Sequence, residues 1–400
     1  MTGAELPLDG LRVLDYGQYV ASPFATMLLS DLGADVIKVE PPSGDEWRRY
    51  DPFEDGESRY FYALNRGKRS VALDLKSPEG RERSRALIAS ADALVHNCLP
   101  ERARRFGLDS ESVRAVNPRC VTVCVSAFGS SGPDSNRPAY DLIGQALSGL
   151  LLADPRPGDA VPRRTGGLAL ADFTAGLLAA LAVTAGLLGR GERAPDLEVS
   201  LLGAALALQA QRFVEVDGRD EPAAGSELAG RAELEALADR AAALEALDPY
   251  YRAHACADGF IALACLNSDQ RRQVCELLAL DDPFAGNPQA EPADGEEHDR
   301  RAAHVRAVED GFARLGAREA VAALAARRVP ASEVRSLGQL FDDAQVRSNG
   351  LVQEVEQAGV GPVRLLGSLF KVDGAAARLG RPAPALDEHA DELFGASTRR

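Results

Sequence analysis

The chain has 400 residues, of which 46% are hydrophobic and 26% charged, a composition typical of soluble globular proteins and sufficient for two domains. Its formal net charge of −15 argues against a nucleic-acid partner and against an anionic membrane surface, because both attract a basic face. A small anionic ligand remains possible, since local basic clusters can form a pocket within an acidic protein.

The cysteines and histidines indicate neither disulfide bonds nor a metal site. The six cysteines contain no Cys-x-x-Cys pair, and Cys120 and Cys124 would lie about 13 Å apart along a strand, too far for a disulfide. We therefore expect reduced thiols and a cytoplasmic protein. The five histidines show no metal-ligand spacing, and the first residues show no signal peptide, so neither a metal cofactor nor secretion is expected.

The first half of the chain alternates predicted strands with predicted helices. Strands are expected at 10–15, 34–40, 70–75, 93–97, 120–126 and 195–200, with helices at 24–33, 78–88, 102–107 and 201–211. A strand, helix and strand in succession form a parallel pair with a right-handed crossover. The loop at 16–23 lacks G-x-G-x-x-G, so NAD is not expected. Residues 1–210 are therefore predicted to form a doubly wound, Rossmann-like α/β domain.

A change of composition marks a second, smaller domain. The Ala/Glu/Arg-rich residues 218–245 indicate a helical linker or arm, and we place a linker at 211–247. A small α+β domain is expected at 248–328, with a strand at 259–265, helices at 270–278 and 301–324, and an acidic loop at 281–300. Residues 329–400 are predicted to link back to the large domain, with short strands at 352–355 and 365–370.

The stretch from Arg163 to Gly176 contains the most informative residue. Asp172 is the only charged side chain between 168 and 188, where a Gly-rich approach meets an apolar helix predicted to end at Gly189. Local sequence favours Asp172 as a helix cap. The alternative is a nucleophile whose developing charge is held by N–H groups at the helix start. The Ala and Gly content favours a buried core helix over a membrane span.

Two basic clusters lie near predicted strand or helix ends, where ligands of open α/β sheets bind. One contains Arg66, Lys68 and Arg69, and the other contains Arg102, Arg104 and Arg105. They could bind phosphates, but solvated surface charges explain them better on local sequence alone.

Several further segments are weak evidence of a family relationship one by one, but strong evidence together and in this order. They are Pro7–Asp15, Gly33–Pro42, Asn65–Ser70 with Leu73–Lys76, Pro138–Asp141 with Gln145–Ala146, and the stretch around Asp172. In this order the chain resembles, over nearly its whole length, the family III CoA-transferases, the CaiB/BaiF group that also includes the α-methylacyl-CoA racemases. The resemblance implies a ring-shaped subunit in an interlocked homodimer, with acyl-CoA and a carboxylic acid as partners.

The resemblance reverses the interpretation of Asp172 and makes it the nucleophile. Its carboxylate would attack an acyl-CoA thioester to give a mixed anhydride, which the CoA thiolate would convert to an aspartyl-CoA thioester. The acceptor acid would then take CoA through a second anhydride. This needs an ionised carboxylate, and the ordinary Asp pKa of about 3.9 satisfies that at neutral pH. Helix-start N–H groups would serve as oxyanion donors.

The resemblance also assigns CoA contacts. They are Val20, Ala21, Leu73, Asp74, Leu75, Lys76, Asn97, Cys98, Leu99, Arg105, Pro138, Ala139, Tyr140 and Asp141. Lys76 and Arg105 suit the CoA phosphates, because cationic donors bind phosphate oxygens well. For Leu73, Asp74 and Pro138, packing or turn formation explains the side chain equally well.

Two alternatives remain beside CoA transfer. A racemase of this group would carry a histidine at the position of Tyr140, and a tyrosine with a pKa of about 10 is a poor base, so transfer is preferred. A non-catalytic CoA-binding relative is the other alternative. It is motivated by His96-Asn97-Cys98 in place of Glu-Asn-Phe and by missing glycine segments near 191–195 and 265–269.

Overall fold

The structure is a computed structural model that describes residues 6–51, 58–214, 230–245, 247–282, 294–377 and 379–395. Its internal contacts divide the chain into two compact units. The first consists of Met1–Leu151, Arg164–Val216 and Phe341–Arg400, and the second of Leu152–Arg163 and Asp217–Leu340. The domain boundaries that we placed at 210, 247 and 328 stay predictions. Part of the expected linker at 211–247 lies outside the described residues.

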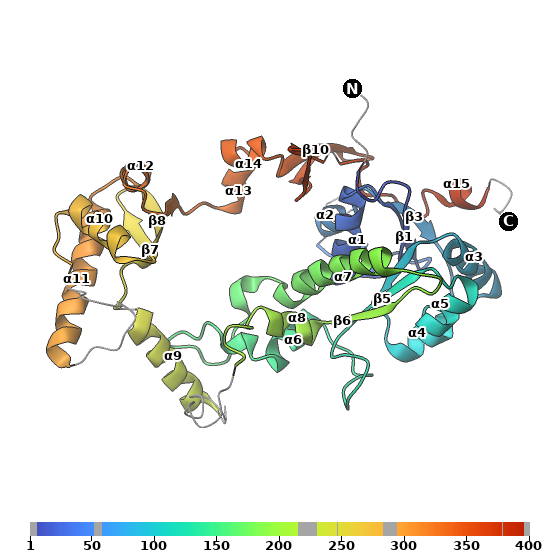
Figure 1. The fold of residues 1–400 in the computed structure, drawn as a ribbon, viewed down its shortest axis with the longest axis horizontal. Helices are drawn as coiled ribbons and strands as arrows, with labels where there is room; N and C mark the ends of the chain where they lie inside the picture. Colours follow the sequence, from blue (N-terminus) through green and yellow to red (C-terminus); the bar gives the residue numbers. More distant parts are fainter. Residues whose placement is uncertain are drawn as a thin grey trace. The chain divides into compact units, whose positions relative to one another are not determined.

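A six-stranded parallel sheet forms the centre of the first unit (Figure 1). Its strand order is β3-β2-β1-β4-β5-β6, and every neighbouring pair is parallel. The strands are β1 Arg12–Asp15, β2 Asp35–Glu40, β3 Arg69–Ala72, β4 Ala93–His96, β5 Val121–Ser126 and β6 Asp196–Ser200. This order reverses direction between β1 and β4, as in Rossmann-like sheets, and confirms the predicted doubly wound arrangement.

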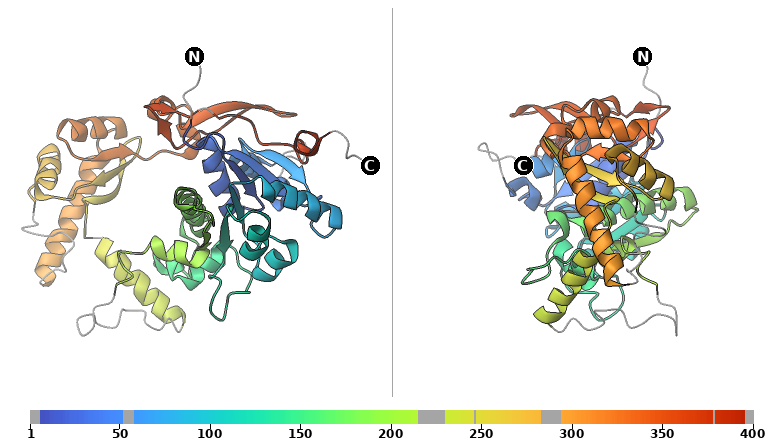
Figure 2. Two further views of the ribbon diagram at one scale, coloured as in Figure 1. Left: turned by 45° about the vertical axis from the view of Figure 1, so that its right-hand side comes forward. Right: turned by 90° about the vertical axis from the view of Figure 1, so that its left-hand side faces the viewer.

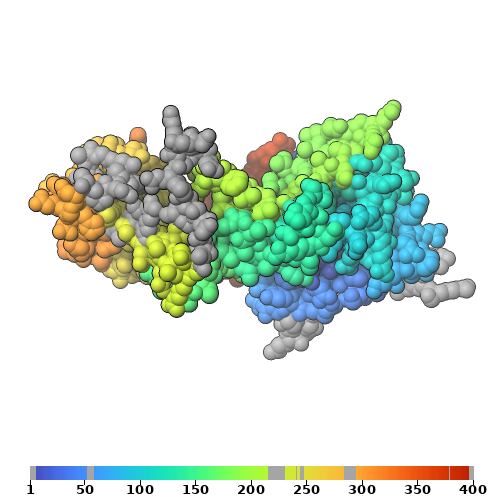
Figure 3. All heavy atoms as spheres, turned by 90° about the horizontal axis from the view of Figure 1, so that it is seen from below, coloured from blue at the N-terminus to red at the C-terminus, as the bar shows by residue number. Residues whose placement is uncertain are grey.

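Helices cover both faces of this sheet. On one face, side chains of α3, α4, α5 and α15 join an apolar cluster around Leu14, Ile37 and Leu94 of the strands. On the other face, α1 and α7 pack on the strands and on each other. The helices are α1 Ala21–Asp31, α2 Arg59–Asn65, α3 Pro78–Ala89, α4 Pro100–Phe106, α5 Ser110–Val116, α6 Asp141–Leu147, α7 Leu170–Gly189, α8 Leu201–Ala207, α14 Ala344–Ser348 and α15 Ala390–Phe394. Cyan and green residues of α4 to α8 form a continuous part of this unit's surface (Figure 3).

Helix α7 ends at Gly189, as predicted. Its buried residues are Ala171, Ala175, Gly176, Ala179, Val183 and Gly186. Small side chains allow this face to approach α1 closely, since a Cβ at Gly176 would lie 2.8 Å from the carbonyl oxygen of Ala21. The helix is apolar and long enough to cross a membrane, and 33% of its most apolar window is buried.

The C-terminal segment returns to the first unit, where it lies beside the N-terminal elements (red and blue in Figure 2). It contains two hairpins, β10 Val352–Gln357 with β11 Gly361–Leu366, and β12 Lys371–Val372 with β13 Ala375–Ala376. Arg66 fixes this return. Its guanidinium group donates to the Asp31 carboxylate at 2.6 and 2.9 Å and to the carbonyl oxygens of Leu366 and Gly367 at 3.1 and 3.2 Å.

The second unit has a three-stranded antiparallel sheet packed against helices. Its elements are α9 Arg231–Glu245, β7 Tyr251–Cys256, β8 Gly259–Ala264, α10 Ser268–Leu278, α11 Gly295–Ala313, α12 Ala317–Ala326, β9 Ala331–Glu333 and α13 Leu337–Leu340. The helical pattern at 301–324 is divided into two helices next to Gly316. The loop predicted at 281–300 is wrong from residue 295 onward, because Asp294 caps α11 by accepting the Glu297 N–H at 2.8 Å. Residues 283–293 lie outside the described residues.

Candidate active site

The reversal of strand order opens a crevice at one edge of the central sheet. The chain leaves β1 towards α1 and leaves the neighbouring β4 towards α4, and these two helices cover opposite faces. Ligands of open α/β sheets bind where such connections separate. A cavity of about 770 Å³ lies there, lined by the segments that follow β1 to β5 and by Asp172 of α7. All its lining residues belong to the first unit.

This cavity collects all but two of the residues to which the resemblance assigned a site. Those that line it are Val20, Ala21, Leu73, Asp74, Leu75, Lys76, Asn97, Cys98, Leu99, Pro138, Ala139, Tyr140 and Asp172. They come from separate stretches of sequence, and the carboxyl ends of parallel strands bring most of them to one edge of the sheet. The two exceptions are Arg105 and Asp141.

Arg105 lies outside the cavity lining, whereas Arg102 of the same helix belongs to it. Phe106, one residue farther along the helix, also lines the cavity, so the side of the helix decides and not the distance along it. At about 100° per residue, Phe106 points within about 40° of Arg102, whereas Arg105 points about 60° away from Arg102 in the other direction. Arg102 and Lys76 are the two basic side chains that line the cavity.

Asn97 joins the two loops that separate at the crevice. Its Oδ1 accepts the Gln18 N–H at 3.2 Å, and its Nδ2 donates to the Gln18 carbonyl oxygen at 2.9 Å. Next to it, the Cys98 N–H donates to Nδ1 of His96 at 3.2 Å. Burial lowers the pKa of His96 to about 4, so this ring is neutral and can accept that bond.

Two tyrosines stand at the cavity on either side of the crevice. Tyr140 donates from its hydroxyl group to that of Tyr19 at 3.4 Å, and the two rings meet edge to face at 5.2 Å. The hydrogen bond with Tyr140, together with burial, raises the pKa of Tyr19 to about 12. The Tyr19 hydroxyl therefore keeps its proton at neutral pH and can donate to a substrate oxygen, but it is no base.

Asp141, not Asp172, caps helix α7. The residue before the helix, Ala169, offers no side-chain cap. Instead the Asp141 carboxylate accepts the N–H groups of Ala171 and Asp172 at 2.9 and 3.3 Å. These are two of the N–H groups that a helix start leaves without an intrahelical partner. The prediction from local sequence that Asp172 is the cap is therefore wrong. Two of the helix-start N–H groups that we expected as oxyanion donors are already bonded to Asp141.

Gln145 holds the capping carboxylate in place. Its Nε2 donates to the second carboxylate oxygen of Asp141 at 2.6 Å and to the Leu168 carbonyl oxygen at 3.1 Å. Leu168 lies just before α7, so Gln145 ties the start of that helix to α6. The Asp141 carboxylate is thus buried and fully engaged, which explains why it does not line the cavity.

Asp172 has the environment of a poised carboxylate. It is half-buried in the cavity wall, and within the described residues no hydrogen bond to its carboxylate oxygens is found. Burial, with a smaller contribution from the negative charge of Asp141, raises the pKa of Asp172 to about 7. The expectation of a fully ionised carboxylate at neutral pH is therefore wrong. An ordinary Asp is solvated, whereas this one is partly withdrawn from water and faces a second carboxylate.

Comparisons with known proteins show the family of the chain. The family model described as CoA-transferase family III matches residues 8–390. The chain belongs to CoA-transferase family III. It is 31% identical to the succinate–glutarate CoA-transferase of Agrobacterium fabrum, covering 98% of this chain and 96% of that protein. It is 32% identical to the mouse succinyl-CoA:glutarate CoA-transferase, covering 97% and 86%. The crystal structure of a CaiB/BaiF family protein from Brucella suis matches with a TM-score of 0.74 at 29% identity, covering 98% and 100%.

Sequence reasoning missed several cavity residues of this family III member. Gln18, Tyr19, Ser43, Ser126 and Ala127 line the cavity beside the assigned residues. Most of them directly follow the strands β1, β2 and β5, so the rule that ligands lie at strand carboxyl ends could have found them. Among the described residues, no group of three or more His, Cys, Asp or Glu side chains could hold a metal ion.

The first basic cluster faces neither the cavity nor solvent, so both interpretations of it were wrong. Arg66, Lys68 and Arg69 are all buried. They pair with Asp31 of α1, Asp15 of β1 and Asp35 of β2, respectively. Three neighbouring cations in a sequence are typical of a phosphate site or a solvated surface, but here each buried cation pairs with a carboxylate of another element.

The raised pKa of Asp172 predicts a pH-dependent stability cost. Below pH 4 both the folded and the unfolded chain hold this proton, so Asp172 costs nothing. As pH rises towards 7, the unfolded chain ionises more readily, and stability falls until the folded carboxylate ionises too. The D172N variant should therefore exceed the wild type in unfolding free energy, by about 2–3 kcal/mol more at pH 8 than at pH 5.

Urea unfolding of both proteins at the two pH values measures this difference. An exposed carboxylate provides the control, and E192Q should shift stability equally at both pH values. An unchanged gap between D172N and wild type at pH 5 and pH 8 would show that the pKa of Asp172 is not raised.

Proposed function

We propose that this family III member moves CoA from an acyl-CoA to a carboxylic acid, with Asp172 as the nucleophile. The observation that carries the proposal is the half-buried Asp172 carboxylate in the wall of the strand-end cavity, without a hydrogen-bond partner among the described residues. A carboxylate already bonded to donors would have to lose them before it could attack. This one is free to attack once it is ionised.

The proposed reaction has four displacements. The Asp172 carboxylate attacks the thioester carbonyl carbon, the C–S bond breaks, and a mixed anhydride and a CoA thiolate result. The thiolate attacks the Asp172 carbonyl carbon and expels the donor acid, leaving an aspartyl-CoA thioester. The acceptor carboxylate attacks that thioester, expels the thiolate and forms a second anhydride. The thiolate attacks the acceptor carbonyl carbon, which releases the new acyl-CoA and restores the Asp172 carboxylate.

The raised pKa of Asp172 suits an exchange in which oxygen and sulfur replace each other. A carboxylate with a pKa of about 7 is a more basic nucleophile than an ordinary Asp. Its pKa is also closer to that of a thiol, which is about 8.5. Displacement of the thiolate by the carboxylate and displacement of the carboxylate by the thiolate are therefore more evenly balanced.

Other cavity residues have roles that follow from their chemistry. The Tyr19 hydroxyl group accepts the hydrogen bond of the Tyr140 hydroxyl group and keeps its own proton to donate to the oxyanions. The two α7 N–H groups that Asp141 already accepts cannot fill this role. Lys76 and Arg102 are the cations that would meet the CoA phosphates. The remaining assigned CoA contacts, apart from Arg105 and Asp141, also line the cavity.

Removal of the carboxylate should abolish transfer. The assay uses succinyl-CoA as donor and glutarate as acceptor, because the names of similar enzymes contain these substrates. In this assay D172A should lose at least about a thousandfold in turnover. Hydroxylamine should trap an acylated peptide containing Asp172 in the wild type only, and mass spectrometry detects it. E192A, at an exposed site, is the control. Normal turnover by D172A would exclude this mechanism, and α-deuterium exchange without transfer would indicate racemisation.

The pH dependence of the reaction should follow Asp172. Because the attacking form is ionised, kcat/KM for acyl-CoA should rise with pH to a plateau, with a midpoint near the raised pKa of about 7. D141N keeps an amide oxygen to accept the two N–H groups but removes the neighbouring charge. Its midpoint should move to lower pH by about half a unit, since burial is the larger cause of the shift. An unmoved midpoint in D141N would show that Asp141 does not influence the charge of Asp172.

The assembly and compartment belong to the same proposal. Leu177, Leu181 and Leu188 on α7 are 50%, 63% and 85% exposed, and they form an apolar surface that a second copy of the chain could cover. This supports a homodimer of the interlocked, ring-shaped kind that the family resemblance implies. Six free cysteines support a reducing compartment, the cytoplasm. The net charge of −15 supports a protein without an anionic membrane surface or a nucleic acid as partner.

Charging this apolar surface should separate the copies. In detergent-free buffer, sedimentation should give a dimer for the wild type and a monomer for L177E/L181E, because burying carboxylates without partners is unfavourable. L366E changes a leucine on β11 that is 48% exposed, and it should leave the dimer intact. A wild-type monomer that binds to lipid vesicles would instead assign the surface to a membrane.

A further inference from the structure

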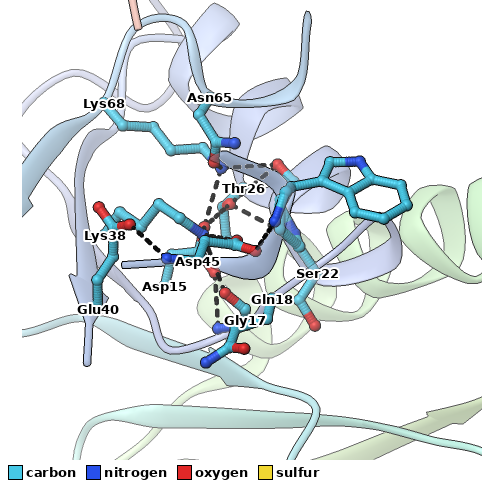
Figure 4. Close-up of polar contacts among 12 residues, drawn as sticks. Asp15, Gly17, Gln18, Ser22, Thr26, Lys38, Glu40, Asp45, Asn65 and Lys68 are labelled. Atoms are coloured by element: carbon cyan, nitrogen blue, oxygen red, sulfur yellow. Dashed lines mark hydrogen bonds and ion pairs between the residues drawn. The ribbon is translucent and has the colours of Figure 1, made fainter. Parts of the chain in front are cut away.

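Four charged side chains without solvent access lie beneath the loop that connects β1 to α1. They are Asp15, Lys38, Asp45 and Lys68, each 0% exposed, and the reaction proposed above does not use them (Figure 4). Lys38 lies 2.8 Å from Asp45 Oδ2 and 3.9 Å from Asp15 Oδ2, and Lys68 lies 2.9 Å from Asp15 Oδ2. Buried charges are costly unless they are paired, and here two cations meet two anions.

These charges also bond to the backbone of the loop. Lys38 Nζ donates to the Gly17 carbonyl oxygen at 3.0 Å, while the Gly17 N–H donates to Asp15 Oδ1 at 2.9 Å. The Tyr19 N–H donates to Asp45 Oδ1 at 3.3 Å. The N–H and the carbonyl oxygen of Gly17 and the N–H of Tyr19 are therefore held by the ion network, and Figure 4 shows Gly17 among these charged side chains.

The far end of the loop is fastened in the same way. Lys68 Nζ donates to the carbonyl oxygen of Pro23 at 2.8 Å and to Asn65 Oδ1 at 2.8 Å. The loop is folded so tightly that a Cβ at Gly17 would lie 2.1 Å from Cβ of Ser22. Tyr19 has a φ of 68°, in the left-handed region that is unfavourable for a residue with a side chain. Such a conformation persists only where its surroundings enforce it.

The network holds part of the wall of the cavity that Asp172 also lines. Gln18, Tyr19, Val20 and Ala21 all line the cavity. The loop also touches α7 one turn beyond Asp172, where the Ala21 carbonyl oxygen leaves no room for a Cβ at Gly176. A shift of this loop would change the space in which a ligand meets the carboxylate.

We propose that the buried ion network of Asp15, Lys38, Asp45 and Lys68 is a positioning device that sets the 17–21 loop against Asp172. It rests on the proposed function, because the ligand held between loop and carboxylate is the acyl-CoA thioester. None of the four residues touches reacting atoms, so they act through the loop. Asp45 tests this best, since its Oδ1 accepts the N–H groups of both Tyr19 and Trp47, the latter at 3.0 Å.

The experiment compares D45A with D45N. The alanine removes the acceptor for both N–H groups, whereas the asparagine keeps an oxygen in the same place. D45A should lower kcat/KM for acyl-CoA by at least about tenfold, because a displaced loop both misplaces the reacting groups and weakens the contacts of the cavity wall with CoA. D45N should recover to within about threefold of wild type.

A matched control separates positioning from simple destabilisation. Asp31 forms a comparably buried pair with Arg66, which binds the C-terminal segment and not the 17–21 loop. D31A should destabilise the chain in urea as D45A does, yet keep kcat/KM within about twofold below its unfolding transition. Equal kcat/KM losses in D45A, D45N and D31A, or none in D45A, would overturn the proposal.

CoA binding can be measured by tryptophan fluorescence even if none of the tested acids accepts CoA. Trp47 is the single tryptophan, its ring lies 5.4 Å from that of Tyr19, and it lines no part of the cavity itself. Its fluorescence therefore measures CoA binding without turnover. If the wild type binds CoA but transfers it to no acid, the proposed function fails alone. Weaker binding in D45A than in D45N then supports positioning, and equal affinity, or no binding in the wild type, overturns it.

Discussion

The reversal of strand order between β1 and β4 is the constraint on which the rest of the first unit depends. A parallel strand must return through a crossover, and here neighbouring strands send their crossovers to opposite faces of the sheet. The two loops that separate there, at 16–20 and 97–99, leave a cavity that side chains from neither loop can fill alone. Asn97 then bridges them by bonding both polar backbone atoms of Gln18, so the crevice stays open but its walls stay in register.

The start of helix α7 shows how one local need shapes the chemistry of the cavity. Its unpaired N–H groups require an acceptor, and the chain supplies Asp141 from α6, held in turn by Gln145. That leaves Asp172 in the first turn of the same helix without a capping task, half-buried and next to a like charge. Its ionised form is disfavoured, which lowers stability at neutral pH and makes the carboxylate more basic. At this residue, the environment that makes the carboxylate more reactive also lowers the stability of the fold.

The buried ion pairs of the first unit link its layers. Arg66 with Asp31 ties α1 and α2 to the returning C-terminal segment, and Lys68 with Asp15 ties β1 to the end of its loop. A charge pair gains little over an apolar pair of equal volume, but it leaves a large cost if one partner is displaced. Such pairs therefore favour one arrangement of loop, helix and tail over others that an apolar core would tolerate. Around the cavity, the buried ion pairs therefore fix the backbone of the loop that follows β1.

The sequence by itself determined the order of strands and helices in the first unit, because buried parallel strands and their helices have periodic apolar patterns that local residues set. It also selected Asp172, an isolated charge in an apolar run, and the motifs that indicated the family. Only the tertiary structure decided what each charge does. Asp141 became the cap, Arg102 replaced Arg105 in the cavity lining, and Lys68 became an internal cation instead of a phosphate ligand. A hydrogen bond, an ion pair or a raised pKa depends on partners that here lie 30 to 53 residues away, and no local pattern specifies those partners.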